Sequence, residues 1–333
     1  MQTVKPGNTD LNFSRIVLGG NVFGWTVNEA DSFDILDAAM ELGINTVDTA
    51  DIYSHWAKGN VGGESETILG KWMKKRGNRD QLVVITKVGG GMGSGEHNIS
   101  REYILQEVET SLRRLGTDVI DLYFTHWDDN RTPVEETLGA YEKLIRAGKV
   151  KYIGASNLTP ERLKASLKAS QEHHLPRYEV FQPGYNLYDR EAFEKGVGPI
   201  CKANGLGVIT YYSLASGFLS GKYRSEKDFA KSVRGSSMKK YLNARGKRIL
   251  KAMDCIAADR DVSLAAIALA WLMQNPMVSA PIASATSRIQ LNAFAEALKL
   301  KLSDQELKEL NEASEYPELP ENFSRANRNI GER

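Results

Sequence analysis

Four side chains that could together transfer a proton each stand at or just after the end of a short apolar stretch. They are Asp48, Tyr53, Lys87 and His126. The carboxyl ends of barrel strands meet at one face, so strands at these stretches would bring the four side chains together. Such a group combines a carboxylate, a phenol, an amine and an imidazole, which is a set that can donate a proton at neutral pH.

A tyrosine in this setting could act as a general acid. A free phenol has a pKa of about 10, and a neighbouring cation lowers that pKa because it stabilises the phenolate. We expect Lys87 to supply the charge, Asp48 to pair with Lys87, and His126 to hydrogen-bond the substrate oxygen. Tyr53 would then protonate a carbonyl oxygen as a hydride reaches the carbon. Each residue alone has an ordinary structural explanation, and only the combination favours catalysis.

Eight short apolar stretches, each followed by a helical pattern, indicate the fold. We expect strands at 15–19, 44–47, 82–86, 119–124, 150–154, 178–181, 207–211 and 278–282. Several are apolar at nearly every position, which is typical of parallel strands buried on both faces. Eight such units predict a (β/α)8 TIM barrel that forms a single domain over residues 1–333, with a patternless tail at about 315–333. An open doubly wound sheet is the alternative, and the strand-end positions of the four side chains favour the barrel.

The composition of the chain argues against several classes of protein. Hydrophobic residues make up 41% and charged residues 26%, as in soluble globular proteins. The net charge of +1 and the lack of a membrane-length apolar run predict neither nucleic-acid nor membrane binding. Cys201 and Cys255 form no C-x-x-C motif and the N-terminus lacks a signal-peptide core, so we expect a reduced, cytoplasmic protein. No zinc or calcium motif is present in the sequence, and we expect no metal.

Seven sequence motifs resemble, in order, those of the aldo-keto reductases. They are D-T-A-D-I-Y (48–53), G-E-S-E (63–66), I-T-K (85–87), D-L-Y-F-T-H (121–126), I-G-A-S-N (153–157), Q-P-G-Y-N (182–186) and the run from Tyr211 through G-F-L-S-G-K-Y (217–223). The match covers residues from about 15 to 310, and the chain is identified as a member of this family. The long-chain members that it most resembles include the β subunits of voltage-gated potassium channels.

The resemblance implies reversible reduction of aldehydes or ketones to alcohols with NADPH, or less well with NADH, by the four side chains named above. It places the nicotinamide at Ser156, Asn157, Gln182 and Tyr211, the pyrophosphate at Leu214, Ser216 and Leu219, and the adenosine end at Ser284, Thr286, Ser287, Arg288 and Gln290. The long, basic, glycine-containing stretch 216–245 would form a flap over the pyrophosphate.

The sequence departs from the family pattern at two places. Ser284 stands where many members have a basic residue, and Ala293 and Phe294 stand where they often have Glu and Asn. Arg288 is therefore the one cation expected to meet a 2′-phosphate, and we expect a modest preference for NADPH. The other departure is Tyr212, which with the next residue replaces the usual Ser-Pro after Tyr211.

Four aromatic residues are candidates for the substrate pocket. Phe23, Trp25, Trp56 and Trp127 fall in loops after predicted strands, where they could line the mouth of the barrel, although packing explains each of them equally well. The expected substrate is a small carbonyl compound, and the sequence indicates no oligomeric state. A redox-sensing subunit that binds NADPH and a protein partner is the alternative function, which the lack of a long N-terminal extension disfavours.

Overall fold

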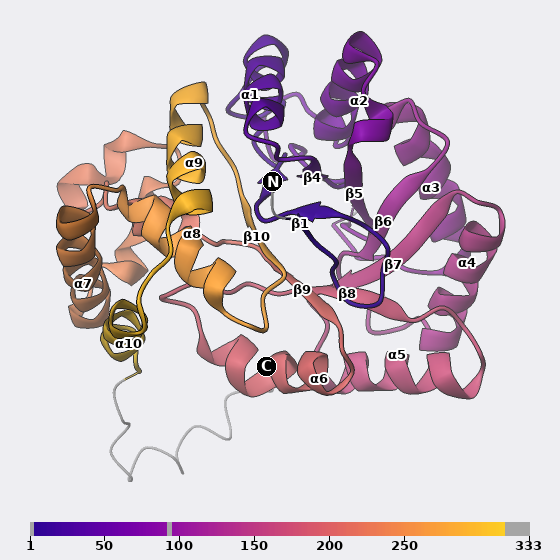
Figure 1. Cartoon of the computed structure of the whole chain (residues 1–333). Helices are drawn as coiled ribbons and strands as arrows, with labels where there is room; N and C mark the ends of the chain where they lie inside the picture. The colour runs from indigo at the N-terminus through magenta and orange to yellow at the C-terminus, as the bar shows by residue number, and fades with distance from the viewer. Residues whose placement is uncertain (1–2, 92–94, 317–333) are drawn as a thin grey trace.

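A closed barrel of eight parallel strands forms the centre of the molecule (Figure 1). The computed structural model describes residues 3–91 and 95–316, so most of the predicted tail lies outside the described residues. The strands are β3 (Val17–Gly19), β4 (Thr46–Asp48), β5 (Val83–Val88), β6 (Ile120–Thr125), β7 (Val150–Ser156), β8 (Tyr178–Gln182), β9 (Gly207–Thr210) and β10 (Ala280–Ala283). Because β10 pairs with both β9 and β3, the sheet closes, which confirms the predicted barrel and excludes the open sheet.

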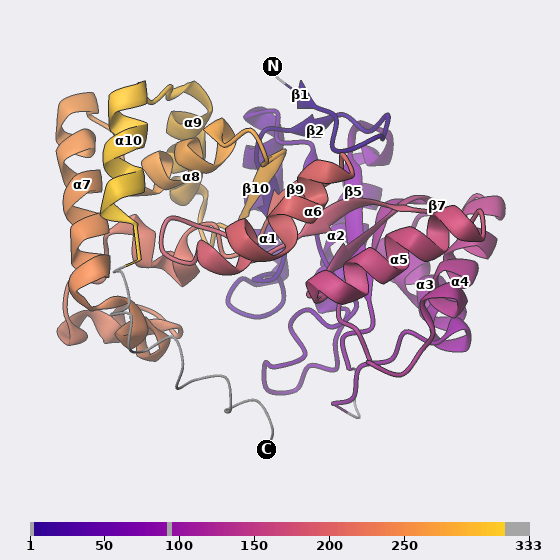
Figure 2. The same cartoon turned by 90° about the horizontal axis from the view of Figure 1, so that it is seen from below.

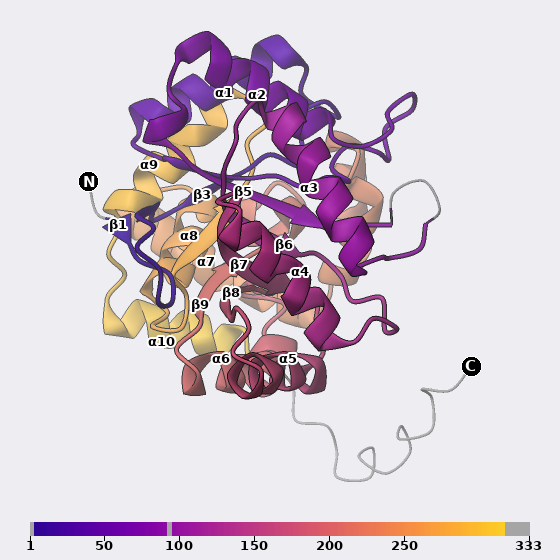
Figure 3. The same cartoon turned by 90° about the vertical axis from the view of Figure 1, so that its right-hand side faces the viewer.

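Helices surround the barrel, and Figure 3 shows α2, α3 and α4 following one another around its outside. The helices are α1 (Glu29–Glu41), α2 (Glu64–Arg76), α3 (Arg101–Leu115), α4 (Val134–Arg146), α5 (Pro160–Glu172), α6 (Gly198–Ala203), α7 (Ala244–Arg260), α8 (Leu264–Gln274), α9 (Asn292–Lys299) and α10 (Asp304–Ala313). Among the described residues, no helix is both long enough and apolar enough to cross a bilayer.

The strand register brings the chemical side chains to one end of the barrel. Asp48 at the end of β4 is paired with Ile85 of β5, and Lys87 lies two residues further along β5, opposite Phe124 of β6. His126 follows the last residue of β6 directly. The parallel order of neighbouring strands therefore places these residues at the carboxyl-terminal end, where barrel enzymes build their active sites.

An N-terminal hairpin closes the opposite end of the barrel (Figure 2). Strand β1 (Thr3–Val4) pairs antiparallel with β2 (Phe13–Ser14). Leu11 and Phe13 are buried in one cluster with residues of the barrel interior, including Val17. The sequence did not predict this hairpin, because two-residue strands carry no detectable periodicity.

The stretch between β9 and α7 is more ordered than the expected long loop. Residues 215–241, called the cover segment below, contain three short helical turns (Ala215–Ser220, Glu226–Lys231 and Gly235–Tyr241). Tyr223, Met238 and Tyr241 are fully or almost fully buried. The ring of Tyr241 stacks on Phe218, with centroids 5.0 Å apart. These residues belong to the main hydrophobic core, so the segment packs against the body of the protein.

Candidate active site

The structure brings Asp48, Tyr53 and Lys87 into one hydrogen-bonded chain. The buried ammonium nitrogen of Lys87 lies 2.7 Å from Oδ2 of Asp48, 2.8 Å from the phenol oxygen of Tyr53 and 2.7 Å from the carbonyl oxygen of Thr49. Tyr53 itself donates to Oδ2 of Asp48 over 3.2 Å. All three protons of Lys87 are therefore engaged, and the amine joins the carboxylate to the phenol.

His126 lies beside this chain as a buried, uncharged imidazole. Its ring centroid is 5.9 Å from that of Tyr53, and its other side stacks on Trp127 at 3.6 Å. Burial lowers the pKa of His126 well below its ordinary value, and the ammonium of Lys87 lowers it further. Nδ1 has no hydrogen-bond partner among the described residues. A neutral imidazole still carries one N–H group. It can therefore donate one hydrogen bond to a substrate oxygen.

The pKa of the Tyr53 phenol moves opposite to the expected direction. Burial raises it well above its usual range, and the negative charge of Asp48 and the hydrogen bond to that carboxylate raise it further. A net lowering of the phenol pKa is therefore not found, because burial and the carboxylate of Asp48 outweigh the effect of Lys87. Tyr53 is accordingly protonated at neutral pH and holds a proton that it can donate.

A cavity of about 1030 Å³ opens beside Tyr53 and His126. Its walls include the predicted contacts Ser156, Asn157, Gln182, Tyr211, Leu214, Ser216, Ser284, Thr286, Gln290, Trp25, Trp56 and Trp127. Tyr53, Asp48 and His126 also line it, whereas Lys87 is fully buried behind them. Tyr53 and His126 thus share one cavity with most of the residues that were expected to contact cofactor or substrate.

The four residues expected to contact the nicotinamide form hydrogen bonds among themselves and with Asp48 and His126. Gln182 donates to Oδ1 of Asp48 over 3.0 Å, and Ser156 donates to the carbonyl of Gln182 over 2.8 Å. Asn157 donates to the carbonyl of His126 over 2.9 Å and accepts from the hydroxyl of Tyr211 over 2.8 Å. Displacing any one of them would therefore disturb the geometry around Asp48 or His126.

Comparison with known proteins agrees with this geometry. Residues 15–315 match the model of the aldo/keto reductase family.

The chain belongs to the aldo/keto reductase family.

Several curated relatives align over nearly the whole chain. Aldo-keto reductase YhdN of Bacillus subtilis (strain 168) is 33% identical over 322 residues, covering 93% of each protein. Protein tas of Escherichia coli (strain K12) is 31% identical over 335 residues, covering 93% of this chain and 96% of its own length. A probable voltage-gated potassium channel subunit beta of Oryza sativa subsp. japonica is 32% identical over 308 residues, covering 90% of this chain and 91% of its own. Membership supports an oxidoreductase role, in a family that generally uses NAD(P)H and acts on small carbonyl compounds.

Four of the predicted contact residues do not line the cavity. Phe23 is fully buried in the main core, and Leu219 of the cover segment is also fully buried. Ser287 stands just before a short helical turn that starts at Arg288. The guanidinium of Arg288 pairs with Asp34, at 3.1 Å, and with Glu41, both on α1. The role expected of Arg288 at a 2′-phosphate stays a prediction, and helix α1 supplies two carboxylates beside it that no local pattern connects with it.

Two cations that sequence reasoning did not single out line the cavity instead. Lys222 and Arg234 both belong to the cover segment. The guanidinium of Arg234 lies over the ring of Trp25, 5.1 Å from the centroid, and pairs with no carboxylate of the described residues. A partly buried arginine that faces a cavity without a counterion favours the binding of an anion. Their basic character was visible in the sequence, but their position over the cavity depends on the folded segment.

Three non-glycine residues of the cavity wall have left-handed backbone conformations. They are Asn157 (φ 53°), Tyr212 (φ 54°) and Ser216 (φ 56°). Such conformations are uncommon for residues with a Cβ atom and persist where surrounding contacts enforce them. Tyr212, which departs from the family motif, is 56% exposed at the cavity. Its ring is therefore accessible at the cavity.

Among the residues that the structure describes, no group of three or more histidine, cysteine or carboxylate side chains could hold a metal ion.

Proposed function

We propose that the protein reduces aldehydes or ketones to alcohols with NADPH, and also catalyses the reverse oxidation. The supporting observation is the buried chain from Asp48 through Lys87 to the phenol of Tyr53, which ends at a cavity. A protonated phenol next to a neutral imidazole has the properties of a general acid with a substrate-orienting partner. The family membership of the chain is consistent with this reaction.

The residues around the cavity fit a nicotinamide dinucleotide. A volume of about 1030 Å³ reaches the upper end of the range for small-molecule sites and leaves room for a small substrate. The aromatic face of Tyr211 and the amides of Asn157 and Gln182 would hold the nicotinamide beside Tyr53. Lys222 and Arg234, with Leu214 and Ser216, would hold the phosphates, and Ser284, Thr286 and Gln290 the adenosine end. When bound, NADPH would supply the hydride for the reaction.

Residues of the protein itself would carry out the proton transfer. The imidazole of His126 would donate a hydrogen bond to the carbonyl oxygen and hold it near the phenol of Tyr53. Tyr53 would release its proton to that oxygen. The ammonium of Lys87, whose nitrogen lies 2.8 Å from the phenol oxygen, would stabilise the resulting phenolate. Asp48 would keep Lys87 charged, because the pKa of that amine is lowered by burial and raised by the neighbouring carboxylate.

Trp25, Trp56 and Trp127 would line the substrate side of the cavity. The rings of Trp25 and Trp56 are nearly perpendicular, with centroids 5.5 Å apart, and Trp127 stacks on the imidazole of His126. Large flat surfaces of this kind exclude water and favour substrates with an apolar or aromatic group next to the carbonyl.

Both cysteines are unpaired thiols, which supports the proposed cytoplasmic location.

The proposed preference for NADPH over NADH is small. A 2′-phosphate carries about two negative charges, which an arginine binds well. Arg288 would have to leave Asp34 and Glu41 to bind it, so part of the gain would be spent in breaking those ion pairs. The adenosine end of the cavity is otherwise lined by neutral residues such as Thr286 and Gln290.

Replacing the general acid tests the proposal. Tyr53→Phe removes the proton and keeps the ring, so turnover of small aldehydes with NADPH should fall by at least about a hundredfold. NADPH affinity, measured by fluorescence titration, should stay close to that of the wild type. Near-normal turnover in the Phe variant would remove Tyr53 from the mechanism, and a wild-type enzyme inactive on a broad panel of carbonyls would refute the reductase function.

A regulatory subunit that senses redox state is the second candidate. The 32% identity with the channel subunit beta named above favours it. Such a protein would bind NADPH but turn it over slowly, and it would respond through a protein partner. Oxidation of many equivalents of NADPH by small carbonyls supports the enzyme, whereas a single slow turnover supports the subunit.

A further inference from the structure

The turn that follows helix α10, residues 314–316, is held by two arginines from other parts of the chain. Arg245, at the start of α7, is only 8% exposed. Its guanidinium lies over the rings of Tyr188 and Tyr316, at 4.2 Å and 3.6 Å from the centroids. It donates to the carbonyl oxygens of Ser314, over 3.1 Å, and of Tyr188. The charge is thus neutralised by no carboxylate of the described residues and is used to join two backbone segments.

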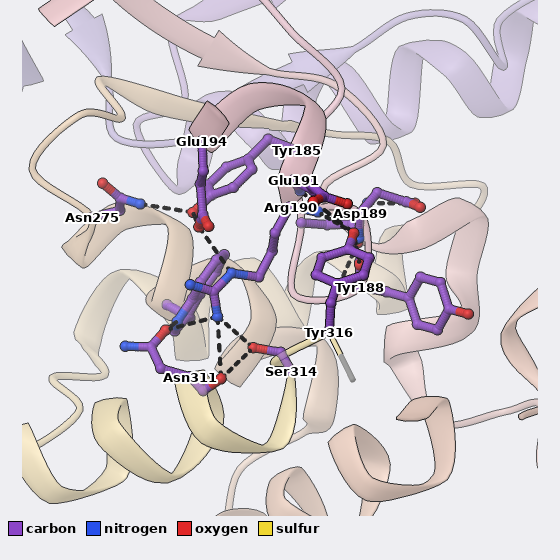
Figure 4. Close-up of polar contacts among 12 residues, drawn as sticks. Tyr185, Tyr188, Asp189, Arg190, Glu191, Glu194, Asn275, Asn311, Ser314 and Tyr316 are labelled. Carbon is purple, nitrogen blue, oxygen red and sulfur yellow. Dashed lines mark hydrogen bonds and ion pairs between the residues drawn. The ribbon is translucent and has the colours of Figure 1, made fainter. Parts of the chain in front are cut away.

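Arg190 forms the second connection (Figure 4). One nitrogen of its guanidinium donates to the hydroxyl of Ser314 over 2.6 Å, and another pairs with Glu194 over 2.8 Å. Glu194 in turn accepts from the hydroxyl of Tyr185 over 2.7 Å. Residues 183–191, called the β8 loop below, are therefore tied to the end of α10.

Tyr316 completes this junction through its hydroxyl group (Figure 4). The hydroxyl donates to the carbonyl of Tyr188 over 3.0 Å and accepts from the backbone N–H of Arg190 over 3.1 Å. It therefore bonds to two backbone groups of the β8 loop, and one of them, the carbonyl of Tyr188, also accepts from Arg245. The C-terminal turn thus contacts the backbone of that loop directly.

The β8 loop is also bonded to the wall of the cavity. Asn186, which is fully buried, donates to the carbonyl of Tyr212 over 3.0 Å. Asp189 accepts from the hydroxyl of Tyr241 over 3.1 Å, and the hydroxyl of Tyr188 donates to the carbonyl of Lys240 over 3.0 Å. The loop therefore holds both Tyr212 and the far end of the cover segment.

We propose that Arg245 and Tyr316 are positioning residues for the cofactor-binding wall. They hold the β8 loop, which enforces the left-handed backbone of Tyr212 and anchors the end of the cover segment that carries Lys222 and Arg234. Strained backbone relaxes when its supporting contacts are removed. The C-terminal turn thereby sets how long the dinucleotide stays bound, although it does not line the cavity itself. This inference rests on the proposed function, because it requires a dinucleotide in the cavity.

Two variants remove the junction to different degrees. Arg245→Met keeps the aliphatic bulk and loses both hydrogen bonds, whereas Tyr316→Phe loses only the hydroxyl group. Arg260→Met is the matched control, because Arg260 also joins α7 to α10, through Glu306, but bonds to no residue of the β8 loop. All three are compared with the wild type by circular dichroism and thermal unfolding, and Tyr316→Phe keeps the test valid if Arg245→Met folds poorly.

Stopped-flow release of NADPH is the deciding measurement. Loss of these hydrogen bonds should speed dissociation by about three- to tenfold in both junction variants. The KM for NADPH should rise by a similar factor. The rate constant of the chemical step, measured in single-turnover experiments, should stay within about twofold of the wild-type value. Amide exchange in the cofactor-free protein should also speed up at residues 212–241. Arg260→Met should change none of these quantities.

The possible failures can be told apart. Wild-type release and exchange rates in a folded Tyr316→Phe variant and in Arg245→Met would overturn the positioning role and leave the proposed function intact. Equal acceleration in Arg260→Met would also overturn it, since the effect would then be general loosening of the helix pair. A wild-type protein that bound no NADPH would refute both proposals.

Discussion

At the scale of single residues, the ionisation of the site follows from burial more than from any one neighbour. Burial raises the pKa of Tyr53 and lowers those of Lys87 and His126. Burial therefore favours the uncharged form of all three groups, as expected for removal from water. Asp48 opposes this for Lys87 by direct pairing, at 2.7 Å. The site thus holds a proton on Tyr53 and a neutral imidazole on His126.

These pKa directions predict the pH dependence of the two reaction directions. Reduction needs protonated Tyr53, whose raised pKa keeps it protonated, so kcat/KM for carbonyl reduction should be constant between about pH 6 and pH 9. Alcohol oxidation needs the phenolate and should rise roughly tenfold per pH unit over the same range. Steady-state rates in both directions provide the test. A reduction rate that falls above neutral pH would mean that Lys87 lowers the phenol pKa in the working enzyme.

Arg288 gives a prediction on cofactor choice. Asp34→Asn combined with Glu41→Gln would free its guanidinium, and the KM for NADPH should fall by about three- to tenfold, less than the full value of a charged hydrogen bond because the group is exposed. The KM for NADH should not change, and it serves as the internal control. Adding Arg288→Ala to the double variant should abolish the gain. If the gain survives that third substitution, Arg288 is not the group that binds the 2′-phosphate.

At the scale of elements, the strands were predicted more accurately than the connections. Residues 82–86 and 119–124 were expected to be strands, and β5 and β6 cover 83–88 and 120–125. Buried parallel strands are continuous apolar runs, so they are visible without tertiary information. The cover segment was expected to be a loop, because its turns are short and its buried residues, such as Tyr223 and Met238, are spaced without a regular period.

The order already present in the cover segment changes what cofactor binding should do to it. Amides next to the buried Tyr223, Met238 and Tyr241 should be protected from exchange in the free protein. Adding NADPH should slow exchange further, mainly near Lys222 and Arg234. These cations line the cavity and would be held by the phosphates. Hydrogen exchange followed by mass spectrometry makes the comparison. Exchange that is fast throughout the free segment would restore the mobile flap that the sequence predicts.

At the scale of the whole molecule, the two ends of the barrel have separate tasks. The carboxyl-terminal end carries the cavity, and the opposite end is closed by the N-terminal hairpin. Substitutions in the interior packing at the closed end should therefore lower the stability of the protein and leave the chemistry unchanged, as in barrels generally.

The hairpin gives a prediction that separates stability from activity. Phe13 is fully buried against the barrel interior, so Phe13→Ala should lower the free energy of unfolding by about 3–5 kcal/mol. The KM for NADPH and kcat at moderate temperature should stay near the wild-type values, because the cavity lies at the other end. Urea unfolding and steady-state kinetics on the same sample test this. A variant of unchanged stability would show that the hairpin does not plug the barrel.

The sequence alone determined the family, the barrel and the set of four side chains that meet at its carboxyl-terminal end. These depend on residue types at strand ends and on local periodicity, which need no knowledge of distant partners. Tertiary structure decided the rest: the pairing of Arg288 with carboxylates on α1, the placing of Arg234 over Trp25, and the junction of Arg245 with Tyr316. Each of these joins groups that the folded backbone brings together from separate elements. No pattern within one element specifies such contacts, since the partner is chosen by how the helices and loops pack around the barrel.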